Sequence, residues 1–179
     1  MLVLDGRTLL EHVTATMKLV FPNVIVSVRR LREEIETPQV CDELVERGPL
    51  VGLVAGMARV DTPWMFAVAC DMPFVEAAMI IQLAKHRFEP AGKNPPQAVI
   101  PMIAGHPQPL AAFYATNSLA VLRKQLAMGD NSIRGAFKHL NVRYVSEDDL
   151  CVSHQLLRSF FDLDTPEDLA QVNLVKESK

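Results

Sequence analysis

The sequence predicts an α/β fold in three layers, with helices covering both faces of a doubly wound, mostly parallel sheet. Apolar runs of strand length alternate along the chain with segments whose apolar residues recur at helical spacing. The segments between them are short, as is usual where helices connect parallel strands. The run at residues 65–70 is apolar on both pleat faces, which is typical of a parallel strand with helices above and below it.

The expected elements follow one another in this alternating order. The first helix begins with the capping-box pattern Thr8-Leu9-Leu10-Glu11 and extends to about Val20. Gly48-Pro49 starts the second helix, because proline is favoured at the first helical position, and Leu50 belongs to the apolar stripe that this helix turns inward. Further strands are expected at residues 24–28, 98–103 and 142–145, further helices at 74–86, 118–128 and 133–140, and a last helix from residue 165.

The start of the chain departs from this alternation. A stub of strand is followed by a turn at Asp5-Gly6, and the turn leads directly into the first helix. The strand that should precede this helix in a strand–helix–strand unit is therefore absent. The sequence predicts a doubly wound sheet with its first strand missing.

Composition and charge exclude several classes of protein. The 179 residues are 49% hydrophobic, and we expect residues 1–179 to form a single domain. The 18 Lys and Arg are balanced by 21 Asp and Glu without a basic cluster, so no nucleic-acid partner is expected. No apolar run reaches the ~18 residues of a membrane helix, and no secretory signal is readable, so a cytoplasmic enzyme or binding domain without membrane contact is expected. The three cysteines lack metal-site spacing and do not suggest a disulfide framework.

Asp71 is the most informative single residue. It directly follows the most apolar strand, and ligands of open α/β sheets bind at the carboxyl ends of strands. Mg²⁺ prefers one or two carboxylates together with phosphate oxygens and water, so a lone aspartate here points to a metal–nucleotide site. The alternative is that Asp71 caps the helix after Pro73, and the residues alone do not separate the two interpretations.

Two further segments are candidates for ligand contact. In Gly48-Pro49-Leu50-Val51-Gly52-Leu53, free amides at a helix N-terminus and a small residue suit an anion or a flat base, although tight helix packing is the simpler interpretation of Gly52. A turn at residues 105–107 leads into the apolar run at 110–114 and could present His106 to a ligand, although turn histidines are more often solvated. The absence of a nucleophile elbow, a GxGxxG segment and a Walker A segment excludes the usual hydrolase, dinucleotide and P-loop sites.

Four motifs occur in a fixed order along the chain: GPLVGL at residues 48–53, ACDMPF at 69–74, QPLAAFY at 108–114 and DTPEDL at 164–169. Together they resemble the molybdenum cofactor guanylyltransferase (MobA) family, and the resemblance covers nearly the whole chain, including Trp64. It implies an enzyme with a Rossmann-like nucleotidyltransferase fold. The implied reaction is Mg²⁺-dependent transfer of GMP from GTP to molybdopterin, with release of pyrophosphate.

The resemblance also implies roles for particular residues. Asp71 would be the catalytic residue that holds Mg²⁺ between protein and nucleotide phosphates. Molybdoenzymes or cofactor-delivery proteins are the partners that it implies beyond GTP and molybdopterin. The residues implied to contact the nucleotide are Ser27, Asp42, Gly48, Pro49, Leu50 and Asp71, and those on the molybdopterin side are Asp162 and Asp164.

This chain departs from the family pattern in two ways. The signature of the form LAGG, three residues, RMG, two residues and K is absent, and its lysine would fall about two residues before Met1, together with the missing first strand. That loop supplies amides and a lysine to the triphosphate, so negligible turnover is expected without it. An internal Met1 taken as the start, or an otherwise incomplete sequence, is the favoured explanation. A non-catalytic protein that binds molybdopterin or a partner is the second, and complementation by a separate chain is the third.

The second departure concerns the nucleotide. Family members often carry Asn where this chain has Asp162 and Asp164, whereas related cytidylyltransferases often carry Asp. A cytidylyltransferase, or another Mg²⁺-dependent nucleotidyltransferase, therefore stays open as an alternative.

Overall fold

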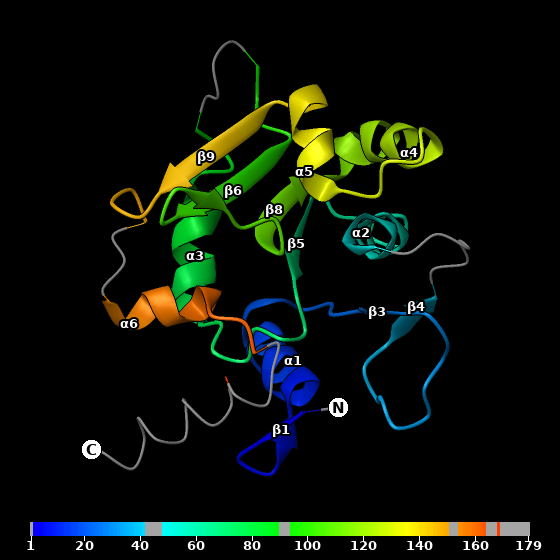
Figure 1. The fold of residues 1–179 in the computed structure, drawn as a ribbon, viewed down its shortest axis with the longest axis vertical. Coiled ribbons are helices and arrows are strands. Elements are labelled where there is room, and N and C mark those ends of the chain that lie inside the picture. The colour runs from blue at the N-terminus through cyan, green and yellow to red at the C-terminus, as the bar shows by residue number, and fades with distance from the viewer. Residues whose placement is uncertain (1, 42–47, 90–93, 151–153, 164–167, 169–179) are drawn as a thin grey trace.

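The computed structural model describes residues 2–41, 48–89, 94–150, 154–163 and 168, and the α/β class is confirmed (Figure 1). The helices are α1 (Leu9–Val20), α2 (Pro49–Met57), α3 (Ala77–Lys85), α4 (Leu119–Ala127), α5 (Ile133–Ala136) and α6 (His154–Leu157), with 3₁₀ turns at Thr116–Ser118, Phe137–His139 and Arg158–Phe160. The strands are β1 (Val3–Leu4), β2 (Arg7–Thr8), β3 (Val26–Val28), β4 (Gln39–Cys41), β5 (Trp64–Val68), β6 (Ala98–Ile103), β7 (His106–Pro107), β8 (Ala111–Ala115) and β9 (Val142–Ser146). The helix expected from residue 165 falls almost wholly outside the described residues.

Five strands form the larger sheet, in which β8 lies between β5 and β6, and β6 also pairs with β7 and β9. Strand β6 is parallel to β9, whereas β8 is antiparallel to both β5 and β6. The sheet is therefore mixed rather than mostly parallel. The reversal begins at Ala104 and Gly105, whose positive φ angles of 49° and 77° turn the chain back on itself, so that the run expected only to follow a turn becomes the central strand β8.

A second, two-stranded sheet consists of β3 and β4, which pair in parallel. Strand β4 was not predicted, because Gln39, Val40 and Cys41 do not belong to an apolar run such as the one at residues 24–28. Within the described part of the chain, no backbone pairing joins β3 or β4 to the larger sheet. The strands β3 and β4 therefore form a sheet of their own among the described residues.

Hydrophobic residues fill the space on both faces of the larger sheet. Neighbouring residues of one strand serve opposite faces, as the period of two requires: Val99 packs on the α1 and α3 side, and Ile100 on the α2 and α4 side. Both residues are completely buried, and burial of such a side chain contributes about 1.5–3 kcal/mol to folding. The two cores hold the sheet between two helical layers, which completes the expected three-layer arrangement (Figure 1).

The N-terminal segment is a small hairpin that leads into α1. Asp5 and Gly6 both have positive φ, 50° and 78°, which suits the tight turn between β1 and β2. The expected capping box is present: the Thr8 hydroxyl accepts a hydrogen bond from the Glu11 amide at 3.2 Å, and the Thr8 amide donates to the Glu11 carboxylate at 2.6 Å. The Thr8 amide and the Thr8 hydroxyl both donate to the Glu11 carboxylate, and these two hydrogen bonds to the charged form lower the pKa of Glu11.

A third, small hydrophobic cluster fixes this hairpin to the rest of the molecule. Leu4 and Leu9 are buried against Leu163, and Leu2 and Phe74 pack around them. The amide of Leu163 donates to the carbonyl of Asp71 at 2.8 Å. The start of the described chain therefore lies beside the turn that follows β5. None of the helices within the described ranges has the length and apolar character needed to span a membrane.

Candidate functional site

Strand β5 determines where Asp71 lies. It pairs along its whole length with β8, from Trp64 opposite Ala115 to Val68 opposite Ala111, and the Ala69 amide extends this pairing by donating to the Leu110 carbonyl at 3.0 Å. Beyond β5 the chain turns twice, because the Met72 amide reaches the Ala69 carbonyl and the Val75 amide reaches the Met72 carbonyl. The side chains of Met72, Pro73 and Val75 are buried. Asp71 thus lies on an anchored turn at the carboxyl end of β5.

The structure decides between the two interpretations of Asp71. Helix α3 begins at Ala77 and its N-cap is Glu76, so the alternative in which Asp71 caps this helix is wrong. Asp71 instead lines a cleft beside Cys70. Although solvent reaches Cys70, burial of the surroundings of its thiol and the negative charge of Asp71 raise the pKa of Cys70. Cys70 therefore remains a thiol at neutral pH rather than a nucleophilic thiolate.

The second wall of the site is the start of α2. Gly48 is its N-cap with φ 144°, and Pro49 occupies the first helical turn, as predicted. A Cβ atom at Gly48 would lie 3.2 Å from Cβ of Asn131, so both the backbone angle and the space favour glycine here. A Cβ atom at Gly52 would lie 3.1 Å from Oγ of Ser27, which confirms the simpler interpretation that Gly52 allows tight packing. That packing brings Ser27 of β3 against α2.

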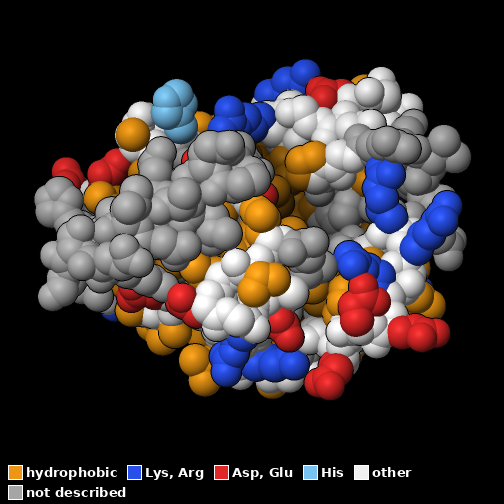
Figure 2. All heavy atoms as spheres, turned by 60° about the horizontal axis from the view of Figure 1, so that its bottom comes forward, with side chains coloured by type: hydrophobic (Ala, Val, Ile, Leu, Met, Phe, Trp, Pro, Cys, Tyr) orange, Lys and Arg blue, Asp and Glu red, His pale blue; other side chains and the backbone are white. Residues whose placement is uncertain are grey.

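These walls enclose one large cleft with a volume of about 1410 Å³. Figure 2, in which the lower side of Figure 1 comes forward, shows the surface hollowed near its centre, with hydrophobic side chains in the hollow. The described residues that line the cleft come from α1, α2, both sheets and the loop before β5: 17–18, 21–25, 27–29, 38, 48–49, 52–53, 56, 59–71, 87–88, 110 and 113.

The structure brings together four of the residues that the resemblance implied. Ser27, Gly48, Pro49 and Asp71 all line the cleft. The side chain of Leu50 points elsewhere, because it is completely buried in the core on the α2 and α4 side.

Of the three other residues that the resemblance names, only Asp162 belongs to the described residues, and it does not line this cleft. Asp162 is exposed outside it, although its neighbour Leu163 bonds to the Asp71 carbonyl. Asp42 and Asp164 lie outside the described residues. His106 is also not brought to the cleft; it is exposed in β7 and pairs with Ile103.

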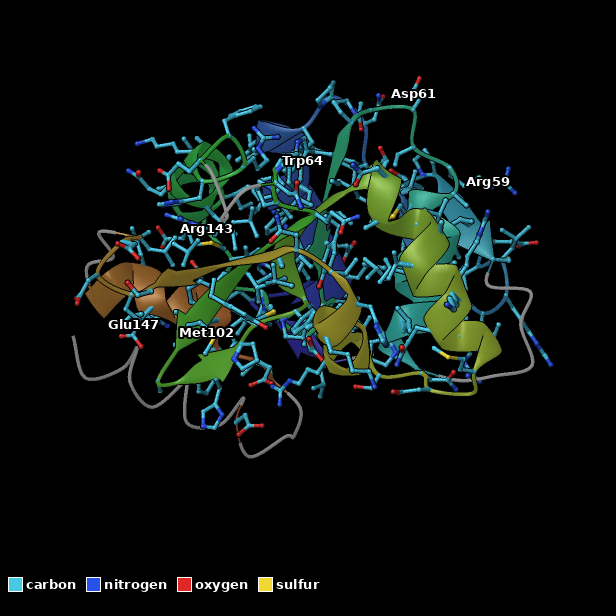
Figure 3. The ribbon with its side chains drawn as sticks, turned by 90° about the horizontal axis from the view of Figure 1, so that it is seen from above. Arg59, Asp61, Trp64, Met102, Arg143 and Glu147 are labelled. Carbon is cyan, nitrogen blue, oxygen red and sulfur yellow. The ribbon has the colours of Figure 1, made fainter. Side chains whose placement is uncertain are left out.

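Charged side chains border the mainly apolar cleft. The cations among its described lining are Lys18, Arg29, Arg59 and Arg87, and the carboxylates are Asp61 and Asp71. The two carboxylates lie at opposite ends of β5, whose five residues extend over about 16 Å. Figure 3 shows Arg59 and Asp61 on the loop between α2 and β5, pointing outward from the molecule. Asp71 is therefore the carboxylate at the carboxyl end, where ligands of open α/β sheets bind.

Arg87 is a cleft residue that the sequence did not reveal. Its guanidinium lies 4.7 Å from the ring centroid of Phe113 and 5.3 Å from that of Phe88, and its Nε donates to the Ala84 carbonyl at 2.9 Å. Burial lowers the pKa of Arg87. No local motif surrounds this residue, because its place in the cleft depends on the packing of α3 against β8.

The side chains at this end of the cleft suit a metal ion that binds to the protein through one carboxylate and takes its other ligands from a bound substrate. Within the described residues, no group of three or more His, Cys, Asp or Glu side chains could hold a metal ion by itself. A single carboxylate at the end of β5 suits a hard divalent cation that takes its other ligands from phosphate oxygens and water.

The chain is similar to known nucleotidyltransferases. Residues 1–146 match the family described as the MobA-like NTP transferase domain. A probable molybdenum cofactor guanylyltransferase of Natronomonas pharaonis is 31% identical over 173 residues, covering 92% of this chain and 82% of the relative. That of Natranaerobius thermophilus is 30% identical over 183 residues, covering 96% and 84%.

Solved structures agree with these sequence relatives. Molybdopterin-guanine dinucleotide biosynthesis protein A from Archaeoglobus fulgidus superposes with a TM-score of 0.82 at 27% identity, over 99% of this chain and 90% of that one. The 2-C-methyl-D-erythritol 4-phosphate cytidylyltransferase of Thermus thermophilus has a TM-score of 0.66 at 14% identity, over 98% and 92%, and shares the fold. The Rossmann-like nucleotidyltransferase fold is thereby confirmed, and enzymes of this class use a divalent metal.

Proposed function

The chain belongs to the family of MobA-like NTP transferase domains, and from this premise we propose that it is a guanylyltransferase that forms molybdopterin guanine dinucleotide. The substrates are GTP and molybdopterin, and the second product is pyrophosphate. The observation that carries the proposal is the position of Asp71, on an anchored turn at the carboxyl end of β5 and facing a cleft bordered by the start of α2. A cytoplasmic location, and transfer of the product to molybdoenzymes or cofactor-delivery proteins, belong to the same proposal.

The reaction is a displacement at phosphorus. An oxygen of the terminal phosphate of molybdopterin forms a bond to the α-phosphorus of GTP. The bond from that phosphorus to the oxygen bridging the α- and β-phosphates breaks, and its electron pair leaves with pyrophosphate. No group of the protein needs to form a covalent bond, so the protein contributes by positioning its substrates and by stabilising charge.

Asp71 would hold Mg²⁺ in this site. The chemistry supplied by an ion held there would be positive charge that offsets the negative charge on the phosphate oxygens. The turn after β5 fixes the backbone position of Asp71, because the side chains of Met72, Pro73 and Val75 are buried and the Asp71 carbonyl accepts a hydrogen bond from the Leu163 amide.

The start of α2 would bind the nucleotide. The first amides of a helix have no partner within the helix and suit an anion or the acceptor atoms of a base. Gly48 and Pro49 border the cleft here, and Leu50, whose side chain is buried, would contribute only through its backbone. Ser27 of β3 packs against Gly52 of α2, so its hydroxyl lies near the start of α2. Asp42, Asp162 and Asp164 stay predictions.

A second candidate is transfer of a cytidine nucleotide. It is favoured by Asp162, the residue type that is frequent in related cytidylyltransferases, which lies one residue from the contact between Leu163 and Asp71. Direct comparison of GTP with CTP separates the two candidates.

The test is calorimetric titration of the chain with GTP and with CTP, each with and without Mg²⁺. We expect Mg²⁺-dependent binding of GTP that is tighter than that of CTP. Asp71→Ala should weaken the Mg²⁺-dependent part by about 10-fold or more, because the metal loses its protein ligand. Asp61→Ala is the matched control, since it removes a carboxylate from the other end of the same cleft.

Three outcomes would contradict the proposal. Equal effects of the two substitutions would remove Asp71 from the metal site. Tighter binding of CTP would favour the cytidylyltransferase. If the folded chain binds neither nucleotide, the protein is better described as a non-catalytic member of the family that binds molybdopterin or a partner.

A further inference from the structure

The start of α2 has no side-chain cap of its own. Gly48 is the N-cap, and a glycine cannot accept the hydrogen bond that a Ser, Thr, Asp or Asn side chain takes from the first helical amides. The Val51 amide donates to the Gly48 carbonyl at 3.1 Å, so the first hydrogen bond of the helix depends on where this glycine lies. Contacts from elsewhere in the chain therefore matter for the position of Gly48.

Asn131 provides such a contact. A Cβ atom on Gly48 would lie 3.2 Å from Cβ of Asn131 and 3.3 Å from its carbonyl oxygen, so Asn131 occupies the side of Gly48 on which a side chain would stand. Asn131 lies in the turn between α4 and α5 (Figure 1). Leu126 of α4 and Ile133 of α5 are buried in the same core as Leu50 of α2. The turn and the start of α2 are thus held against one common core.

The carboxylate of Asp130 gives this turn its shape. Its Oδ1 atom accepts a hydrogen bond from the Ser132 amide at 2.9 Å, which closes the turn around Asn131. Its Oδ2 atom accepts from Nε2 of Gln125, whose side chain on α4 is only 1% exposed. Ser132 is also the N-cap of α5, and its hydroxyl accepts from the Gly135 amide at 3.2 Å. Asp130 therefore ties the turn both to its own backbone and to the buried side of α4.

Gly135 closes the remaining side of this carboxylate. A Cβ atom on Gly135 would overlap Oδ2 of Asp130 and would lie 2.7 Å from Nε2 of Gln125, so the bonded pair packs directly on the backbone of α5. A hydrogen bond between a buried amide and a charged carboxylate is stronger than one between neutral groups, and a buried donor that loses its acceptor is costly. The position of the turn is therefore specified by its hydrogen bonds and by its packing together.

We propose that Asp130 is a positioning residue for the nucleotide. Through the turn at residues 130–132 it holds Gly48, and with it the first amides of α2, at the wall of the cleft where the nucleotide would bind. The described lining of the cleft does not include Asp130, so it acts through Asn131 and Gly48 rather than by touching the ligand. The inference rests on the proposed function for the identity of the ligand, whereas the effect on α2 can be measured without a ligand.

Amide hydrogen exchange of the full chain, without nucleotide, tests the positioning. Asp130→Asn keeps the shape of the side chain, but a carboxamide has one acceptor oxygen and cannot serve both Ser132 and Gln125 as the two carboxylate oxygens do. We expect exchange at Val51 to become about 10-fold faster, because the start of α2 opens more often. The Ala58 amide, which is hydrogen-bonded at the other end of α2, is the internal reference and should not change.

Two further variants separate positioning from a general loss of stability. Gln125→Met removes the same hydrogen bond but replaces a buried amide by an apolar side chain of similar size. Exchange at Val51 should rise in this variant, while its urea midpoint stays close to that of the parent chain. Asp149→Asn is the matched control, because Asp149 likewise accepts from the amide and the hydroxyl of Ser146, in the turn after β9. It should leave exchange at Val51 unchanged.

Calorimetric titration with GTP tests the consequence for the ligand. Asp130→Asn should weaken GTP binding by about 10-fold at unchanged stoichiometry, because the amides of α2 are displaced from the nucleotide. The factor should be the same with and without Mg²⁺, in contrast to Asp71→Ala, which affects the Mg²⁺-dependent part. A variant that only unfolds part of the protein would lower the stoichiometry instead.

Three results would overturn the inference. Unchanged exchange at Val51 in both Asp130→Asn and Gln125→Met would show that the turn does not hold α2. Equal acceleration at Val51 and Ala58, or the same change in Asp149→Asn, would show a general loss of stability. Unchanged GTP affinity in Asp130→Asn, where the parent chain binds GTP, would remove its role in nucleotide binding. If the parent chain binds no GTP, the proposed function fails, and exchange at Val51 alone decides whether Asp130 positions α2.

Discussion

Strands β5 and β8 are neighbours of equal length and similar apolar character, yet their environments differ. All five residues of β8 are buried, whereas all five of β5 are only half-buried. β8 has a strand on both sides, and β5 pairs with β8 alone within the described residues. The comparison shows that apolar character by itself does not decide burial. Burial depends on whether a second strand pairs with the other edge. Strand β5, which pairs on one edge only within the described residues, is the strand that leads to Asp71.

The largest expected difference between the two strands is in the free energy of unfolding when one phenylalanine in each is replaced by alanine. Phe113 of β8 is 1% exposed and lies against Phe66 of β5, with 4.9 Å between ring centroids. Phe113→Ala should lower the free energy of unfolding by about 3–5 kcal/mol, because it leaves a closed cavity. Phe66→Ala should cost less than about 2 kcal/mol, since its ring is already partly in water. Urea unfolding measures both, and equal losses would mean that the β5 edge is covered in solution.

Two glycines of α2 test how this helix packs on the two sheets: Gly52 faces β3, and Gly56 faces Met65 of β5 and Ile25. Gly52→Ala would place a methyl group 3.1 Å from the Ser27 hydroxyl and should destabilise the protein by about 1 kcal/mol, because the hydroxyl must leave its rotamer or α2 must shift slightly away from β3. Gly56→Ala is the matched control, since its methyl group would meet Met65 and Ile25 at ordinary contact distances. It should be neutral or stabilise by up to about 1 kcal/mol through helix propensity. Thermal unfolding distinguishes them, and destabilisation by Gly56→Ala alone would refute the assigned packing.

The smallest expected loss of stability comes from removing the Tyr114 hydroxyl in β8. The Tyr114 hydroxyl donates to the Pro109 carbonyl at 2.8 Å, and burial raises the pKa of Tyr114 well above its usual value. Tyr114→Phe should cost about 1 kcal/mol at neutral pH, because the carbonyl loses its donor.

The same tyrosine predicts a dependence on high pH. Its phenol loses a proton near pH 10 in the unfolded chain but keeps it in the folded one. Its stabilisation is therefore complete below about pH 10 and is lost as the pH rises above that value. Urea midpoints across this range should fall less steeply in Tyr114→Phe than in the parent chain, and parallel curves would show that the phenol titrates normally in the fold.

The sequence predicted the elements whose pattern is local. The strand at residues 98–103 and the helix after Gly48-Pro49 have the predicted bounds or start, because a buried apolar run and a proline at the first helical position are signals within the segment itself. The direction of β8 was not predictable in this way. Parallel and antiparallel strands with both faces covered have the same apolar pattern, and the direction depends on where the chain after Gly105 finds its partner.

The site was predicted to a similar extent. Asp71 could be found because it ends an apolar strand, and its place in the cleft follows from that position. Arg87 could not, because it reaches the cleft through contacts between distant parts of the chain. Two predictions concerned Leu50: that it belongs to the inward apolar stripe of its helix, and that it contacts the nucleotide. Its complete burial confirms the first. The contact that the resemblance implies is therefore restricted to the backbone of Leu50.

The contact between the hairpin and Leu163 also has a mechanical consequence. Leu4 and Leu163 belong to one small cluster, and Leu163 is bonded to the carbonyl of Asp71. A force that pulls residues 2 and 163 apart would load this cluster and the Asp71 hydrogen bond together, because Leu163 takes part in both, before it reached the five paired residues of β5 and β8. Under tension, the molecule would lose the geometry around Asp71 first, while both hydrophobic cores remained folded.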